Sequence, residues 1–240
     1  MKKVLFFISG FLFALILGAL AGAYWYSRSW EHSLFIKPLN YFPTSKKQIA
    51  LTFDDGPSSS RTPKLLALLR KHNVKATFFL LGKNIEKHPE IAKQIFQEGH
   101  LLGNHAYSHK RLVFVSPDFI RAEIEKTDSL IQALGQKEVR YFRPPFTAKF
   151  IFLPWVLKQM DKTLVTGTYD PPAEYNLPYI ADSISTQVID HAAPGYIVYL
   201  HDGKNADSDA FVLAIEKIII QLKAEGYEFL RLDDKEITGQ

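Results

Sequence analysis

Two hydrophobic patterns divide the chain. An almost unbroken apolar run covers residues 4–23, whereas after residue 47 short apolar runs alternate with longer amphipathic ones. A run of about twenty apolar residues is long enough for a helix to cross the roughly 30 Å hydrocarbon core of a bilayer. Because no polar face interrupts the run, the buried core helix of a soluble domain is a poorer interpretation. The pattern predicts a membrane-spanning or signal helix ahead of one folded region.

The flanks of the apolar run allow both interpretations. Lys2 and Lys3 precede it and residues 24–26 (Tyr-Trp-Tyr) follow it, which favours a single-pass anchor in the cell membrane with the rest of the chain outside the cytoplasm. Residues 19–21 (Ala-Leu-Ala) and 21–23 (Ala-Gly-Ala) both fit a small-x-small cleavage site, so a secreted or periplasmic protein is the alternative. We assign residues 1–25 to this segment and residues 26–47 to a linker with one Pro-containing turn.

Strand and helix patterns alternate through the rest of the chain. Strands are predicted at 48–53, 75–80, 100–104, 139–142, 163–166, 196–200 and 228–232. Helices are predicted at 63–72, 89–98, 118–134, 180–191 and 208–225, most with Pro near the start or Gly just past the end. About seven strand–helix units in one domain predict an α/β fold with a parallel sheet, either closed as a barrel or doubly wound. This domain spans residues 48–233, and a tail covers residues 234–240.

Composition excludes several classes of protein. The 240 residues include no Cys, which excludes disulfide scaffolds, thiolate metal sites and cysteine nucleophiles. Of the formal net charge of +4, Lys2 and Lys3 supply half, so the remainder is close to neutral. A nucleic-acid binder would carry a basic stripe, and none is present in the sequence.

Side chains suited to chemistry follow four of the predicted strands. They are Asp54 and Asp55 after the first strand, His105 and His109 after the third, Arg143 after the fourth and His201 after the sixth. In barrels of parallel strands the active site forms at the carboxyl ends of the strands. The positions of these residues therefore predict that they meet at one edge of the sheet.

The spacing of two histidines suggests a metal site. His105 and His109 are four residues apart, so on a helical turn both imidazoles would face the same way. A carboxylate from another strand would complete three protein ligands and leave a position for water, as in catalytic zinc sites. Asp54 and Asp55 offer one carboxylate for the metal and one for proton transfer, although a turn or helix cap is the alternative interpretation of this pair.

The motifs around these residues resemble those of a known family. Four segments are similar to four of the five motifs of the polysaccharide deacetylases, carbohydrate esterase family four: Leu51-Thr52-Phe53-Asp54-Asp55-Gly56-Pro57, His105-x-x-Ser108-His109, Arg143-Pro144-Pro145-Phe146 and Leu200-His201-Asp202. The resemblance covers residues 48–232 and implies a distorted (β/α) barrel. It also implies a divalent metal, usually zinc, although cobalt and nickel suit the same ligands.

The resemblance assigns a role to each matching residue. It implies that Asp55, His105 and His109 bind the metal, that Asp54 is the general base held by Arg143, that His201 is the general acid, and that Leu200 and a backbone N–H near Phe146 contact the acetyl group. Four further histidines, at positions 72, 88, 100 and 191, are interpreted as structural or surface residues.

One motif of the family is altered in this chain. The usual segment carries an Asp followed by an Asp-Trp pair, whereas residues 169–175 read Tyr-Asp-Pro-Pro-Ala-Glu-Tyr. Asp170 is the expected partner of His201, and Glu174-Tyr175 is a possible substitute for the missing pair.

The resemblance implies a metal-dependent hydrolase that removes N-acetyl groups from an N-acetylglucosamine-containing polysaccharide outside the cytoplasm. Two alternatives stay open, an O-acetyl esterase with the same site and a catalytically silent glycan-binding module. The expected partners are a glycan and, through the N-terminal helix, a membrane, with no nucleic acid. No pattern in the sequence indicates an oligomeric state.

Overall fold

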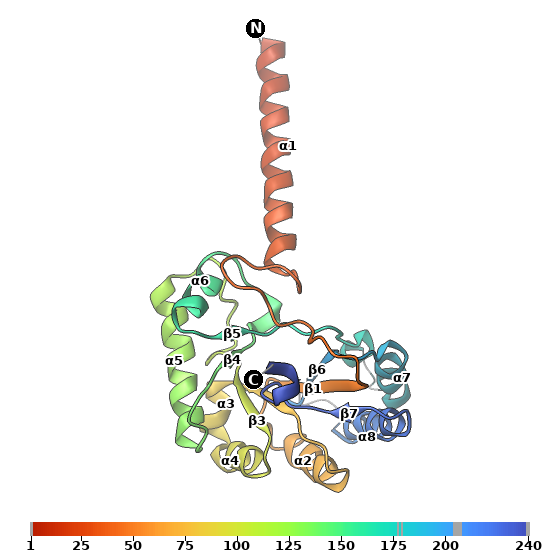
Figure 1. Ribbon diagram of the computed structural model, residues 1–240. Helices are drawn as coiled ribbons and strands as arrows, with labels where there is room; N and C mark the ends of the chain where they lie inside the picture. The colour runs from red at the N-terminus through yellow and green to blue at the C-terminus, as the bar shows by residue number, and fades with distance from the viewer. Residues whose placement is uncertain (1, 177, 179, 204–207, 239–240) are drawn as a thin grey trace.

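The computed structural model describes residues 2–176, 178, 180–203 and 208–238. Within them, seven parallel strands form one curled sheet in the order β5-β4-β3-β2-β1-β6, with β7 paired to the start of β1. Figure 1 shows the strands at the centre of the domain with the helices around them. The predicted distorted barrel of parallel strands is confirmed.

The strands fall where the alternation of apolar runs predicts them. They are β1 (Gln48–Asp54), β2 (Thr77–Leu80), β3 (Leu101–Asn104), β4 (Tyr141–Phe142), β5 (Thr163–Leu164), β6 (Ile197–His201) and β7 (Glu228–Phe229). Most are shorter than predicted, because the curled sheet pairs only a few residues of each run.

The longer helices also match their predicted positions. The helices are α1 (Lys2–Ser27), α2 (Thr62–Lys71), α3 (Gly82–Lys87), α4 (Pro89–Gln97), α5 (Pro117–Ala133), α6 (Phe152–Gln159), α7 (Ala181–His191), α8 (Ser208–Ala224) and α9 (Lys235–Thr238), with 3₁₀ turns η1 (Pro145–Thr147) and η2 (Pro172–Tyr175). The short helices α3, α6 and α9 and both 3₁₀ turns were not predicted from the sequence. These elements span only one or two turns, too short for an apolar period to show.

Side chains along β1 point alternately to the two faces of the sheet. This alternation places apolar residues in two layers and a polar residue of the site at the end of the strand. Leu51 and Phe53 point outward into the layer between the sheet and the surrounding helices. Ala50 belongs to a second layer inside the curl, together with Phe42. Asp54 has the same parity as Ala50 and is fully buried at the carboxyl end of the strand. The alternation thus carries a carboxylate to the inner mouth of the barrel.

The segment expected to be a linker is packed into the barrel. Leu39 forms a bridge with Val165 just past β5, and Tyr41 forms one with Tyr196 just before β6. Phe42 is fully buried. The sheet is open between β5 and β6, and this segment fills the seam.

The end of α1 is held against the domain. Ser27 is buried, and its carbonyl accepts a hydrogen bond from the Lys149 backbone N–H at 2.8 Å. The Lys149 ammonium donates to the Ser29 carbonyl, and the Thr166 hydroxyl donates to the Trp30 carbonyl at 2.7 Å. Burial lowers the pKa of Lys149 to about 8. We call these contacts the foot of α1.

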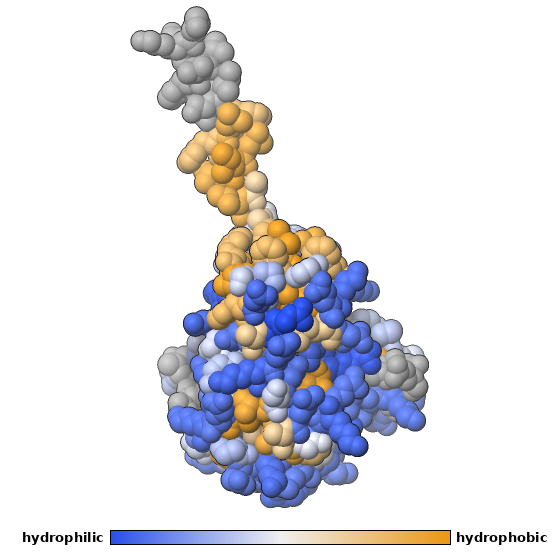
Figure 2. Space-filling model, turned by 90° about the vertical axis from the view of Figure 1, so that its left-hand side faces the viewer, coloured by the Kyte–Doolittle hydropathy of each residue, from blue (hydrophilic) through white to orange (hydrophobic). Residues whose placement is uncertain are grey.

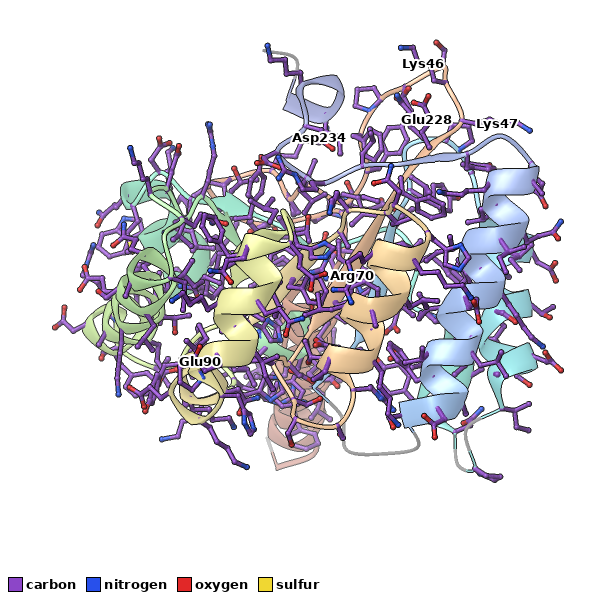
Figure 3. All side chains as sticks on the ribbon, turned by 90° about the horizontal axis from the view of Figure 1, so that it is seen from below. Lys46, Lys47, Arg70, Glu90, Glu228 and Asp234 are labelled. Carbon is purple, nitrogen blue, oxygen red and sulfur yellow. The ribbon has the colours of Figure 1, made fainter. Side chains whose placement is uncertain are left out.

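The rest of α1 projects away from the domain, as Figure 1 shows. Residues Gly10–Ser27 are long and apolar enough to cross a membrane, and the side chains from Gly10 to Trp25 are almost all exposed. The opposite side of the domain, seen in Figure 3, carries charged side chains such as Arg70 on α2 and Glu90 on α4. Surface ion pairs join elements on that side, including Arg70 with Glu98 at 2.6 Å.

Candidate active site

One cavity of about 420 Å³ lies at the carboxyl ends of the strands. Asp55, His105 and His109 contribute to its lining together with Asp170, Tyr175 and His201, and the remaining wall includes Arg28, Trp30, Phe146, Thr147 and Tyr199. The structure therefore gathers side chains from four separate strand ends around one space.

Three potential metal ligands converge in this cavity. The ligand-capable atoms of Asp55, His105 and His109 all lie within 4.8 Å of one another. Asp55 Oδ1 is 3.1 Å from His109 Nε2 and 3.4 Å from His105 Nε2, and this buried oxygen has no hydrogen-bond partner among the described residues. Burial opposes ionisation of Asp55, but its contacts with the two histidines hold the pKa of its carboxyl well below the usual value. The carboxylate is therefore charged across the physiological range.

The second nitrogen of His105 fixes the tautomer of that ring. Its Nδ1 lies 2.7 Å from the Arg143 carbonyl oxygen, which can only accept a hydrogen bond, so Nδ1 is protonated. Nε2 then carries a lone pair directed toward Asp55. Metal-binding histidines are oriented by such a bond at the other ring nitrogen. A lone pair beside an unpaired carboxylate oxygen suits a divalent cation, so the residues present fit the expected metal.

The loop that carries the two histidines is not the helical turn predicted from their spacing. Residues 105–109 are irregular, and Ala106 and His109 have left-handed φ angles of 64° and 63°. Asn104 Oδ1 accepts a hydrogen bond from the Ala106 N–H at 2.7 Å. Glu123 Oε2 accepts from the next two backbone N–H groups at 3.1 and 2.8 Å. These side-chain bonds replace the helical ones and bring the two imidazole centroids to 5.3 Å.

Asp54 is held by a buried arginine. Its Oδ1 accepts a hydrogen bond from Arg143 Nη1 at 2.7 Å, and both side chains are fully buried. The guanidinium lies between the rings of Phe79 and Tyr199, with its carbon 4.2 and 4.3 Å from their centroids. Asp54 Oδ2 has no hydrogen bond among the described residues and lies 3.6 Å from His105 Nε2. One carboxylate oxygen is thus fixed while the other faces the metal ligands.

The loops after β1 and β6 approach too closely for a side chain at Gly203. A Cβ there would lie 2.1 Å from the Asp55 carbonyl oxygen. Asp55 itself has a left-handed φ of 69°. Asp202, next to Gly203, is fully buried and accepts a hydrogen bond from the Thr62 hydroxyl at 2.5 Å, and burial raises its pKa to about 7. This tight packing sets the direction of Asp55.

On the other side of the cavity, His201 is paired with Glu174. His201 Nδ1 lies 2.9 Å from Glu174 Oε2, and Glu174 Oε1 accepts from the backbone N–H of His201 at 2.7 Å. Sequence analysis expected Asp170 as the partner. Asp170 accepts a hydrogen bond from the Tyr175 hydroxyl at 2.8 Å and belongs to the same cluster, with its ligand-capable oxygen within 4.8 Å of that of His201. The η2 turn causes the difference, because it carries the fully buried Glu174 against the strand end.

Tyr175 stands between Asp170 and His201. Its hydroxyl oxygen is 3.4 Å from His201 Nε2. Burial and the nearby Asp170 carboxylate raise the pKa of Tyr175, so the hydroxyl keeps its proton at physiological pH.

Two residues expected to contact the acetyl group have different surroundings. Leu200 is fully buried in the apolar layer between sheet and helices, so the expectation that it lines the cavity is wrong. Because side chains alternate along β6, Tyr199 lines the cavity beside His201. Phe146 does line it, with its ring centroid 4.6 Å from that of His109.

Sequence analysis also missed the wall next to α1. The Trp30 ring stacks on Tyr199 with centroids 6.2 Å apart, and Arg28 lines the same cavity. The alternation of β6 could have indicated Tyr199. Trp30 gives no local signal, since its position depends on contacts with residues far along the chain.

Known proteins are similar to this chain in sequence and in fold. The sequence profile named polysaccharide deacetylase matches residues 42–164. A peptidoglycan-N-acetylglucosamine deacetylase of Bacillus cereus is 37% identical over 202 residues, which cover 79% of this chain and 68% of that protein.

Solved structures agree with the sequence comparison. A peptidoglycan N-acetylglucosamine deacetylase crystallised with a naphthalenyl N-hydroxybenzamide superimposes with a TM-score of 0.76 at 38% identity, covering 82% of this chain and 91% of that one. A CE4 family pseudoenzyme from Bacillus anthracis gives a TM-score of 0.74 at 28% identity, covering 81% and 67% of the two chains. The shared fold therefore occurs both in a deacetylase and in a pseudoenzyme.

Proposed function

The chain belongs to the polysaccharide deacetylase family, and we propose that it is a metal-dependent hydrolase that removes N-acetyl groups from an N-acetylglucosamine-containing polysaccharide outside the cytoplasm. One observation carries this proposal. His201, paired with the Glu174 carboxylate, lines the same cavity as three potential metal ligands, and directly behind them the buried Asp54 places an oxygen without a hydrogen bond among the described residues 3.6 Å from His105 Nε2. A base, an acid and a metal site are what hydrolysis of an amide requires.

Asp55, His105 and His109 would hold the cation. Two imidazoles and one carboxylate suit zinc, and cobalt or nickel can use the same donors. When bound, such a cation polarises the acyl oxygen and lowers the pKa of a water molecule.

Asp54 acts as the general base in this proposal. Its Oδ2 faces the metal ligands without a hydrogen-bond partner among the described residues, so it can accept the proton of the attacking water. Arg143 fixes Oδ1 and keeps the carboxylate in place. The aromatic rings above and below the guanidinium prevent Arg143 from turning away.

His201 acts as the general acid. An amide nitrogen leaves only if it is protonated, so a proton must be delivered to it as the C–N bond breaks. Glu174 accepts a hydrogen bond from Nδ1, stabilises the charged imidazolium and directs Nε2 into the cavity. The Tyr175 hydroxyl lies 3.4 Å from Nε2. A leaving group bound close to this hydroxyl would be within reach of the proton on Nε2.

Acetate release from defined glycans tests the proposal. The full chain, purified in detergent and supplied with zinc, is incubated with N-acetylglucosamine oligomers and with peptidoglycan. We expect acetate from an N-acetylated substrate, its loss in His201→Ala, and no loss in His191→Ala, an exposed histidine outside the cavity. Release only from O-acetylated glycans would establish an esterase instead. Glycan binding without any hydrolysis would establish a silent module, and either result contradicts the proposal.

A further inference from the structure

The exposed side of α6 is apolar in its first turn, whereas Lys158 and Gln159 in its last turn are exposed and polar. Its inner face buries Leu153, Val156 and Leu157. Its outer face exposes Ile151 at its N-cap together with Phe152 and Trp155, with 42%, 46% and 38% of their surfaces accessible. The spacing of three and four residues places these side chains on one side of the helix. A helix in contact with water carries polar residues on that side, so this face is suited to an apolar surrounding.

Two other exposed aromatic residues extend the same surface. Phe114 is 83% exposed, and its ring lies 5.6 Å from that of Phe150, next to Ile151. Phe35 is 51% exposed and borders a groove with Tyr26 of α1. Figure 2 shows apolar residues gathered on the part of the domain that α1 leaves. We call the set Phe35, Phe114, Ile151, Phe152 and Trp155 the apolar rim.

The contacts at the foot of α1 fix the distance of the apolar rim from a membrane that α1 crosses. A helix of 26 residues is about 39 Å long, more than the roughly 30 Å of a hydrocarbon core. The exposed Tyr24 and Trp25 near its end are side chains that prefer the membrane–water interface. Because Ser27 is already buried against the domain, no free chain separates this interface from the rim.

The active-site cavity lies next to the end of α1. Arg28 and Trp30, which directly follow α1, line the cavity together with the metal ligands and His201. The exposed Lys110 and Arg111 come between His109 and Phe114 and offer positive charge to lipid phosphates. An enzyme held in this way meets glycans at the membrane surface and cannot swing out to distant polymer.

We infer that the apolar rim rests in the interfacial layer of the bilayer that α1 crosses, and that the substrate is an N-acetylated glycan carried on a membrane lipid. The inference rests on the proposed deacetylase function and on retention of α1. A bilayer is favoured over a protein partner as occupant of the rim because apolar residues gather where an apolar helix of membrane-spanning length leaves the domain.

A comparison of two forms of one substrate tests this inference. The full chain is placed in vesicles of phosphatidylethanolamine and phosphatidylglycerol. It receives N-acetylglucosamine tetramer either free or joined by its reducing end to a phospholipid in the same vesicles. Because confinement to one surface raises the effective concentration, we expect at least about tenfold faster acetate release from the lipid-linked tetramer.

The possible results separate this inference from the proposed function. Equal rates on the two forms would overturn the inference and leave the deacetylase function standing. No acetate from either form would overturn both. A mature chain that begins after Ala21 or Ala23 and is recovered without membranes would also overturn the inference.

Substitutions in the rim sharpen the test. In the double variant Phe152→Ser/Trp155→Ser, we expect the ratio of the rate on the lipid-linked tetramer to the rate on the free tetramer to fall severalfold. The rate on the free tetramer should stay unchanged. The matched control is Leu213→Ser/Ile220→Ser, which removes two exposed apolar side chains from α8, 46% and 52% accessible. An unchanged preference in the rim variant, or an equal fall in the control, contradicts the inference.

Fluorescence gives a readout that does not depend on activity. The emission of Trp155 is obtained as the difference between the native chain and Trp155→Phe in vesicles that contain brominated lipids. We expect bromine to quench this difference signal, and an unquenched signal would show that the rim does not touch the bilayer.

Discussion

Two clusters of acidic residues and histidine border the active-site cavity, and their chemistry differs although their composition is similar. One comprises Asp55, His105 and His109, and the other Asp170, Glu174 and His201. In both, the ligand-capable atoms lie within 4.8 Å of one another. By donor type and distance alone, either cluster could hold a metal ion.

The hydrogen bonds separate the two roles. In the first cluster a buried Asp55 oxygen has no hydrogen-bond partner among the described residues, and His105 presents a lone pair toward it. In the second, Glu174 accepts hydrogen bonds at both oxygens, from Nδ1 and from the backbone N–H of His201. A carboxylate paired with the Nδ1–H of an imidazole stabilises the protonated form of that ring. The pairing of Glu174 with His201 therefore favours proton transfer at the second cluster and metal binding at the first.

Removal of a ligand from the first cluster has the largest expected effect. In His109→Ala we expect the bound zinc to be lost and deacetylation to fall roughly a thousandfold or more, since a metal supplies several kcal/mol of transition-state stabilisation. Zinc content by mass spectrometry and acetate release measure the two effects. Glu174→Gln is the matched control and should keep its zinc. Loss of zinc in the control as well would mean that the two clusters do not have separate roles.

Removal of His201, the proposed general acid in the second cluster, should lower deacetylation nearly as much and leave the bound zinc in place. For His201→Ala we expect a fall in kcat of about 10²–10⁴ on an N-acetylated substrate, the usual contribution of general acid catalysis. The fall in kcat should be much smaller on an acetate ester with a good leaving group, because the oxygen of that group can leave without being protonated. Equal losses on amide and ester would contradict the role of acid.

Neutralising the partner of His201 should change the pH dependence rather than abolish activity. The Glu174 carboxylate, 2.9 Å from Nδ1, favours the protonated imidazole, so in Glu174→Gln the protonated form of His201 is less stable. Because the acid must be protonated, the alkaline limb of the kcat profile should move to lower pH. An Asp170→Asn variant serves as comparison and should shift this limb less. A larger shift in Asp170→Asn would assign the partner to Asp170.

The smallest expected effect is that of Tyr175→Phe. This change removes one hydrogen bond to Asp170 and the hydroxyl near His201 Nε2, a loss of about 0.5–1.5 kcal/mol or roughly two- to tenfold in kcat/KM. Zinc content should not change. A loss as large as that of His201→Ala would mean that Tyr175 itself delivers the proton.

The parts of this site that sequence could predict are those fixed by the parallel sheet. Asp54 and His201 end strands that lie side by side, so the rule that parallel strands place their carboxyl ends at one edge was enough to bring them together. The same rule brings Arg143 to the neighbourhood of Asp54.

The parts that failed depend on side-chain contacts between distant segments. The spacing of His105 and His109 suggested a helical turn, but Glu123 on α5 holds that loop in another conformation. The family resemblance implied Leu200 in the cavity, but the alternation along β6 places Tyr199 there and Leu200 in the layer between sheet and helices. The family resemblance pointed to Asp170, with Glu174-Tyr175 as a possible substitute, because nothing in the sequence showed that the 3₁₀ turn η2 (Pro172–Tyr175) carries Glu174 to His201.

If the chain is exported as proposed above, the seam between β5 and β6 has a consequence for the order of events. A chain that crosses the membrane behind its N-terminal helix delivers Leu39 and Tyr41 early, whereas their partners Val165 and Tyr196 emerge much later. Before Val165 and Tyr196 emerge, the barrel cannot close, and the inner apolar layer around Phe42 is not enclosed. Completion of the domain must therefore wait for nearly the whole chain, and it takes place beside the point of entry. We expect chains truncated before Tyr196 to expose this layer at the membrane and to be sensitive to proteases there.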